Sequence, residues 1–194
     1  HGSPKTIPDS DKKCDYDYRR KSKVYTIESW ANTLYDLLVK LEIRTFCYVP
    51  DAGHRVLIDR STADPDVLSI PLATEEEGVA LLAGTHLGGK RGVLLMQSSG
   101  VGNCINMMSL ISAGQFPFLS IVSMRGEFGE QNPWQVPMGN AVETCLTAMG
   151  TRCIRIEQEH EINPTIEAAV NMAYISNQSL AVLLSQKLIG AKAF

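Results

Sequence analysis

The sequence contains no hydrophobic run that approaches the roughly 20 apolar residues needed to cross a membrane. Positive charge is also in short supply, because 18 Lys and Arg residues face 21 Asp and Glu residues and the formal net charge is −3. No basic stripe follows the part of the chain that is expected to fold, although nucleic-acid-binding proteins commonly carry one. We therefore expect neither a membrane nor a nucleic acid as a partner.

Familiar metal, nucleotide and nucleophile motifs are absent as well. The five cysteines are widely spaced without a C-x-x-C pair, so the sequence predicts no metal site. Three of them lie in or beside apolar segments, which is typical of buried thiols in a reducing cytoplasm. The chain has no G-x-x-x-x-G-K-[ST] phosphate loop and no G-x-S-x-G turn. These absences disfavour nucleoside triphosphate chemistry and serine hydrolysis.

What remains is the composition of an ordinary globular domain, with 44% apolar and 20% charged residues in a chain of 194. Residues 1–23 differ, because they are rich in Lys, Arg and Asp and nearly lack aliphatic side chains. We expect them to form a disordered tail, and the leading His-Gly-Ser is typical of a cloning remnant. The expected domain spans residues 24–194.

Helical and strand-like patterns alternate through this domain. Apolar residues at helical spacing predict helices over 26–43, 75–87, 104–114, 140–149 and 164–176. Short β-branched and aromatic runs predict strands over 45–50, 67–73, 92–96, 116–124, 152–156 and 180–185. The strand segments are continuously apolar, which favours burial on both faces. The sequence predicts an α/β fold, a mainly parallel sheet with helices on both faces.

Ligands of such sheets bind beyond the carboxyl ends of the strands. Four loops follow predicted strands: PDAGH (50–54), ATEEE (73–77), QSSGVGN (97–103) and RGEFGEQNPWQ (125–135). Because parallel strands end at the same edge, we expect these four loops to lie together.

Three consecutive carboxylates, Glu75, Glu76 and Glu77, open the helix predicted over 75–87. All three gain from the helix dipole, so one interpretation is an ordinary acidic helix start. Successive helical residues point about 100° apart, however. Glu75 lies nearest to the strand end and is expected to point into the crevice, while Glu76 and Glu77 turn away. There Glu75 could share a proton with a bound base.

The segment SSGVGN (98–103) predicts a glycine-rich turn. It lacks the third glycine and the downstream acid of a dinucleotide site, so we do not expect one. A ligand ring could still approach the backbone of Ser99, Gly100 and Gly102 closely. Asn103 is expected to cap the following helix.

Arg125, at the next strand end, has two interpretations. It could bind an anionic substrate, or it could form an ion pair with Glu127 or Glu130. Phe128 and Trp134 are expected to pin the same loop down.

Taken in order, the segments VPDAGH, ATEEEGVALLAGTHLGG, GVLLMQSSGVGN and RGEFGEQNPWQ resemble the pyrimidine-binding domain of thiamine diphosphate enzymes. The chain is most similar to the alpha subunit of sulfopyruvate decarboxylase, and phosphonopyruvate decarboxylase is a close relative. The resemblance covers about residues 26–185, and TEEEGVALLAG joined to LLMQSSGVGN is its most specific part.

This resemblance implies a cofactor and a catalytic acid. In such domains the acid is followed nine positions later by a glycine, and Gly84 follows Glu75 at that spacing. The family's glutamate hydrogen-bonds N1′ of the aminopyrimidine ring and supports the proton exchange that readies thiamine diphosphate for attack on a 2-oxo acid. Glu75 is then catalytic, with a shift of one residue to Glu76 as the alternative. The cofactor-binding residues implied are Glu75, Ser99, Gly100, Gly102 and Asn103.

The resemblance also implies substrate contacts. Relatives place substrate-facing groups in the loop that matches VPDAGH. Gln97 and Ser98 stand where some decarboxylases carry two histidines, which implies a different proton relay here. Arg125 suits a sulfonate or phosphonate by charge, and Gln135 is expected to face the same cavity. The implied substrate-binding residues are Asp51, Gly53, His54, Gln97, Ser98, Arg125 and Gln135.

The superfamily holds the diphosphate through Mg²⁺ in a separate domain that carries a G-D-G motif, and no G-D-G occurs here. The resemblance therefore implies a partner beta subunit with the diphosphate- and Mg²⁺-binding half, in a homodimeric, α₂β₂ or larger assembly. The expected enzyme is a cytoplasmic carboxy-lyase that converts 3-sulfopyruvate, a small anionic 2-oxo acid, to sulfoacetaldehyde and CO₂. Two alternatives stay open: a decarboxylase subunit for phosphonopyruvate or another 2-oxo acid, and a non-catalytic α/β binding or scaffolding module.

Overall fold

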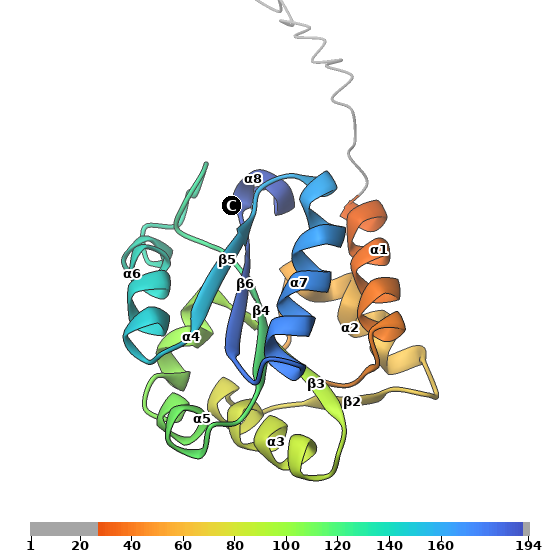
Figure 1. Ribbon diagram of the computed structural model, residues 1–194. Coiled ribbons are helices and arrows are strands. Elements are labelled where there is room, and N and C mark those ends of the chain that lie inside the picture. The colour runs from red at the N-terminus through yellow and green to blue at the C-terminus, as the bar shows by residue number, and fades with distance from the viewer. Residues whose placement is uncertain (1–26, 192–194) are drawn as a thin grey trace, which may run out of the picture.

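The computed structural model describes the backbone of residues 27–191 and the side chains of residues 30–191. A six-stranded sheet forms its middle layer, and helices cover both faces (Figure 1). The tail expected over 1–23 lies outside the described residues. Among the residues that are described, no helix has the length and apolar character to span a bilayer.

The sheet has the strand order β2-β1-β3-β4-β6-β5, and every neighbouring pair is parallel. This confirms the predicted α/β class and makes the sheet parallel throughout the described chain. The strands are β1 (Ile43–Tyr48), β2 (Leu68–Pro71), β3 (Arg91–Gln97), β4 (Phe118–Ser123), β5 (Arg152–Ile156) and β6 (Ser179–Leu184). β2 lies at one edge, where Pro71 ends it without costing an interior hydrogen bond.

One face of the sheet is covered by α1 (Ile27–Lys40), α2 (Arg55–Ala63) and α7 (Ile162–Tyr174). The other face is covered by α3 (Glu75–Leu87), α4 (Ser98–Cys104), α5 (Met108–Gly114) and α6 (Gln135–Ala148). Three short helices complete the described fold: η1 (Ala52–His54), η2 (Glu159–Glu161) and α8 (Gln186–Ile189).

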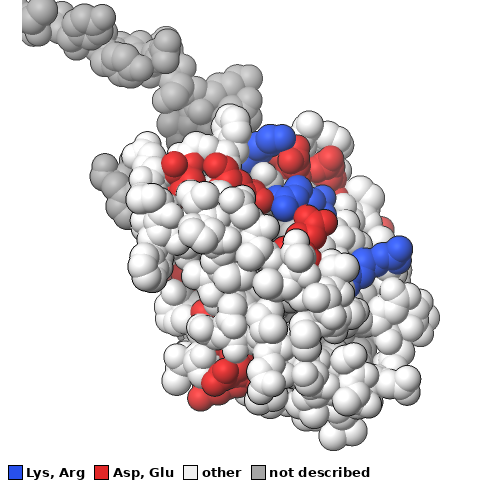
Figure 2. Space-filling view, turned by 90° about the vertical axis from the view of Figure 1, so that its left-hand side faces the viewer, with Lys and Arg blue, Asp and Glu red and all other residues white. Residues whose placement is uncertain are grey.

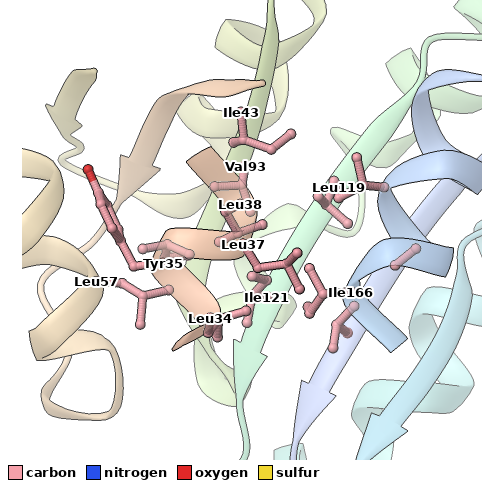
Figure 3. Close-up of a cluster of buried hydrophobic side chains, with 14 of the residues drawn as sticks. Leu34, Tyr35, Leu37, Leu38, Ile43, Leu57, Val93, Leu119, Ile121 and Ile166 are labelled. Carbon is pink, nitrogen blue, oxygen red and sulfur yellow. The ribbon is translucent and has the colours of Figure 1, made fainter. Parts of the chain in front are cut away.

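Each face has its own apolar core, and the central strands contribute to both. In β3, Val93 and Leu95 pack on the α1 side, whereas Leu94 and Met96 pack on the α3 side, all without exposed surface. Figure 3 shows the first of these cores, between α1, α7 and the strands. Burial of one such side chain contributes about 1.5–3 kcal/mol. The continuous apolar strands are thus explained by helices on both sides.

Three local predictions were wrong. The glycine-rich segment after β3 is a helix, α4, instead of a turn, and α5 begins only at Met108 after a break. The helix expected over 140–149 begins earlier, at Gln135. In addition, α2 and α8 were not predicted.

Candidate functional site at the carboxyl ends of the strands

The loops after β1, β2, β3 and β4 share one edge because all these strands are parallel. This confirms the expectation that the four polar loops lie together. Their side chains form two groups. A carboxylate group lies between α3 and α4, and a cavity is bordered by η1, the end of β4 and α8.

Glu75 is the first residue of α3 and is only 8% exposed, whereas Glu76 and Glu77 are exposed. One oxygen of its carboxylate, Oε2, accepts a hydrogen bond of 2.8 Å from Asn103 Nδ2. The helical spacing therefore turned Glu75 inward as predicted. Asn103 lies inside α4, so the expectation that it caps a following helix was wrong.

Gly100 explains how α4 can approach the first turn of α3. A Cβ atom at this position would lie 2.5 Å from Cδ of Glu75 and 2.6 Å from its Cγ, and real Cβ contacts are almost never this short. The missing side chain therefore leaves the space that the Glu75 carboxylate occupies. Ser99, Gly102 and Asn103 of the same helix are exposed and are accessible to a ligand beside Glu75.

A row of hydrogen bonds joins the ends of three neighbouring strands. Asp51, after β1, accepts from Gln97 Nε2 at 2.9 Å, from Ser123 Oγ at 2.5 Å and from the backbone N–H of Gly53 at 3.2 Å. Ser99 Oγ donates to Gln97 Oε1 at 3.0 Å and so connects the row to α4. Gly53 packs against Ser123, where a Cβ would meet the serine Cβ at 2.8 Å. These bonds fix the plane of the Asp51 carboxylate.

Beside this row lies a cavity of about 180 Å³. Asp51, Gly53, Ser123 and Arg125 line it on the strand side, and apolar atoms of Trp30 and Ile189 line it as well. Typical ligand pockets have volumes of about 300–1,000 Å³, so this one suits a small molecule.

Arg125 is 8% exposed and forms its ion pair with Glu130, one of the two acids weighed from the sequence. The hydrogen bonds from Arg125 lower the pKa of the Glu130 carboxyl, and the same contact raises the pKa of Arg125. The backbone N–H of Arg125 also donates to Ser98 Oγ at 3.1 Å. Arg125 thus both lines the cavity and takes part in a buried ion pair.

Four of the residues implied as substrate-binding do not line the cavity. Gln97 lies in the adjoining row of hydrogen bonds, and the other three are His54, Ser98 and Gln135. His54 has no exposed surface, its Nε2 lies 3.1 Å from the backbone oxygen of Met96, and burial lowers its pKa. Ser98 is also fully buried. Gln135 begins α6, and its Oε1 is buried and has no partner among the described residues. A substrate contact does not fit the buried positions of His54 and Ser98.

Some functional candidates could not be found from local sequence. Ser123 lies 72 positions from Asp51, and its only signal was a polar residue at the end of a mainly apolar strand. Gln186 and Glu130 are joined by a hydrogen bond of 3.0 Å although they lie 56 positions apart in the sequence.

Phe128 and Trp134 were expected to pin the loop, but they are 65% and 83% exposed. Within residues 27–191, no three His, Cys, Asp or Glu side chains lie close enough together to hold a metal.

Comparison with known proteins identifies close relatives, although no family model matches the chain. The sulfopyruvate decarboxylase subunit alpha of Methanocaldococcus jannaschii is 34% identical over 151 residues, which cover 77% of this chain and 89% of that protein. The sulfopyruvate decarboxylase of Methanosarcina acetivorans is 32% identical over 119 residues, which cover 61% of this chain but 30% of that protein. A phosphonopyruvate decarboxylase of Streptomyces viridochromogenes is 34% identical over 96 residues, covering 49% and 24% of the two chains.

Among solved structures, the 2-oxoglutarate:ferredoxin oxidoreductase of Magnetococcus marinus has a similar fold, with a TM-score of 0.66. The superposition covers 82% of this chain and 29% of that one, at 12% sequence identity. At this level of identity the likeness concerns the fold alone.

Proposed function

Because this chain belongs to the sulfopyruvate decarboxylase alpha-subunit family, we propose that it forms half of a thiamine diphosphate-dependent active site for 2-oxo acid decarboxylation. The substrate that fits best is 3-sulfopyruvate, and the products are sulfoacetaldehyde and CO₂. One observation carries this proposal. Glu75 holds a nearly buried carboxylate at the ligand-binding edge of the sheet, and Gly100 and Asn103 fix its position.

The side chains around Glu75 fit an aminopyrimidine ring. Glu75 offers a carboxyl oxygen to a ring nitrogen, and Ser99 and Asn103 present a hydroxyl and an amide on the exposed side of α4. Gly102 leaves the same surface without a side chain, so a flat ring can approach the backbone. Glu75, Ser99, Gly100, Gly102 and Asn103 are therefore the residues proposed to hold the pyrimidine half of the cofactor.

Thiamine diphosphate supplies a thiazolium that accepts the electron pair released when CO₂ leaves. The task of this chain is to hold and move a proton at the pyrimidine nitrogen. A carboxylate whose plane is fixed by Asn103 can do so without first losing conformational freedom. Glu75 is the catalytic residue in this proposal.

The substrate is proposed to bind at the row of strand ends and the adjoining cavity. Asp51, Gly53, Gln97 and Arg125 surround this region, and the Arg125 guanidinium has the charge and planar shape to bind a sulfonate. The small volume of the cavity agrees with a small acid.

The diphosphate and Mg²⁺ are proposed to bind to a partner beta subunit. The match to the longer Methanosarcina acetivorans decarboxylase covers 30% of that protein, which leaves ample length there for a second functional half. An interface between the two halves, in an α₂β₂ or larger assembly, would then close over Glu75.

The surface beside Glu75 has the composition of an interface. Residues 92–124 contain no charged side chain, so α4 and α5 have none. The next helix, α6, has only one charged residue, Glu143. On the side of the molecule where α4 and α6 lie, Figure 2 shows a broad uncharged area, with charged side chains gathered at its upper end and in a small acidic patch at its lower edge. Trp134, the N-cap residue of α6, is 83% exposed. Charged residues are depleted and Trp is enriched at the cores of protein interfaces.

A cytoplasmic location is proposed as well. In the part of the chain that the structure describes, the four cysteines are free, and Cys47 and Cys104 are buried. Free buried thiols suit a reducing compartment.

The test is a CO₂ assay with sulfopyruvate after co-purification of the chain with its partner subunit. Activity is expected to require thiamine diphosphate and both chains. Glu75→Gln is expected to abolish turnover without preventing assembly, whereas the adjacent, exposed Glu76→Gln retains it. Assembly is followed by Trp134 emission, which shifts to shorter wavelength when a partner covers the indole.

Equal loss in both variants, or full activity in Glu75→Gln, would contradict this assignment. The latter is what a non-catalytic scaffolding module predicts. The match to phosphonopyruvate decarboxylase keeps one other substrate in view. The ratio of kcat/KM for sulfopyruvate, phosphonopyruvate and pyruvate decides between them.

A further inference from the structure

Glu130 has an unusual number of hydrogen bonds for a loop residue. Its side chain is 1% exposed, and its two oxygens accept from Arg125 Nε at 2.7 Å and Arg125 Nη2 at 2.8 Å. The backbone N–H groups of Gly126, Gln131 and Asn132 donate to the same carboxylate at 2.9–3.0 Å. The Glu130 carboxylate therefore holds both the backbone of the loop after β4 and the guanidinium of Arg125 in place.

Gln186 ties this arrangement to the rest of the fold. Its Nε2 donates to Glu130 Oε2 at 3.0 Å, and its Oε1 accepts from the backbone N–H of Glu127 at 2.8 Å. Gln186 is 1% exposed and begins α8, directly after β6. The loop is thus fastened to a neighbouring strand end and does not rely on its own exposed Phe128 or Trp134.

We propose that Glu130 is a positioning residue for substrate specificity, because it holds the Arg125 guanidinium in one orientation at the cavity wall. This inference rests on the proposed function, in which Arg125 binds the sulfonate of the substrate. Glu130 takes two nitrogens of the guanidinium in a side-on pair, which fixes the plane of the group. A fixed plane favours a tetrahedral anionic group that meets the guanidinium in one geometry, and such a group is present in sulfopyruvate but absent from pyruvate.

The informative change is Glu130→Asp, which keeps the charge but withdraws the carboxylate by one methylene group. We expect kcat/KM for sulfopyruvate to fall roughly 10- to 100-fold, mainly through KM, since small misplacements of a binding group have effects of this size. The value for pyruvate should change little, so the ratio between the two substrates falls. Glu130→Gln should act in the same direction and more strongly.

Glu127→Gln is the matched control. It lies on the same loop, and it removes the ion pair of Glu127 with Arg155. If a variant only loosens the loop, kcat/KM should fall equally for sulfopyruvate and pyruvate, whether the change is Glu130→Asp or Glu127→Gln. Arg125→Lys completes a double-mutant cycle, in which Glu130→Asp should add little to the loss that Arg125→Lys already causes.

A second readout does not depend on turnover. In the chain labelled with ¹⁵N-arginine, the Nε–H resonance that disappears in Arg125→Lys should be slow to exchange and shifted downfield by the bond to Glu130. It should lose both properties in Glu130→Asp and Glu130→Gln, and keep them in Glu127→Gln.

An unchanged substrate ratio in an active Glu130→Asp complex, or equal losses for both substrates, would overturn the specificity role. An unchanged Nε–H resonance would overturn the positioning itself. If the wild-type complex decarboxylates neither acid, the proposed function has failed, and the resonance still decides whether Glu130 orients Arg125.

Discussion

Replacing Gly100 with alanine should separate helix stability from the placement of Glu75. The added Cβ would lie 2.5 Å from Glu75 Cδ, while ordinary contacts begin at 3.4 Å. The carboxylate, or α4 itself, must therefore move by about 0.9 Å. Such a shift would lengthen or break the 2.8 Å bond from Asn103.

The expected effects on stability and activity differ in size. In an ordinary helix interior, a change from glycine to alanine stabilises by about 1 kcal/mol. Overpacking costs about 1–3 kcal/mol, so the free energy of unfolding should fall by roughly 0–2 kcal/mol. Activity should fall much more, because a displacement of 1 Å in a catalytic group can lower the rate by about 100-fold.

Urea unfolding of the chain and kcat of the assembled complex measure the two effects. Gly84→Ala is the matched control for the stability measurement, since Gly84 lies in α3 and its added Cβ would meet no atom within 4 Å. That variant should gain stability. If Gly100→Ala also gained stability and kept its kcat, Gly100 would not hold Glu75 in place, and the reasoning about this site would be wrong.

Three further changes test other contacts. Asp51→Asn should lower kcat/KM, with a stability loss of only about 1 kcal/mol in urea, because the amide still accepts some of the three hydrogen bonds made to the carboxylate. The fold lowers the pKa of Glu130, so the ionised carboxylate stabilises the fold at pH values above the ordinary glutamate pKa of 4.5. This contribution is lost progressively as the pH falls below 4.5. The difference in Tm between wild type and Glu130→Gln should therefore be largest near neutral pH and shrink in acid. Tyr174→Phe should cost about 1–2 kcal/mol in urea unfolding, because its hydroxyl bonds both the N–H and the C=O of Gly92.

The alternation of helices and strands could be predicted because both faces of the sheet are buried. Helical spacing placed α3 at Glu75–Leu87, and the strand-like run at 152–156 placed β5 at Arg152–Ile156, the bounds that the structure has. The inward direction of Glu75 followed from the same helical geometry. These features depend on neighbours within a few residues of one another.

The features that were missed depend on tertiary contacts. Glycine disfavours helix, so 98–103 predicted a turn, yet Gly100 lies in a helix because only glycine fits beneath Glu75. The helix α2 was missed because its apolar residues, Val56, Leu57 and Ile58, are contiguous and give no clear helical period. The pairing of Ser123 with Asp51 joins strand ends that are far apart in the chain. Neither propensity nor spacing contains this information.

The polar groups at this edge are held mainly by one another. Asn103 bonds Glu75, three donors bond Asp51, and Glu130 bonds Arg125. Such a network fixes orientation before a ligand arrives, which lowers the entropic cost of binding. It also reduces the gain from each new contact, since a ligand must share bonds that are already made. The chain alone should therefore bind thiamine diphosphate weakly, and strong binding should appear only when a partner adds contacts to the diphosphate. Tight binding of the cofactor to the isolated chain, measured by titration calorimetry, would contradict this view of a site divided between two subunits.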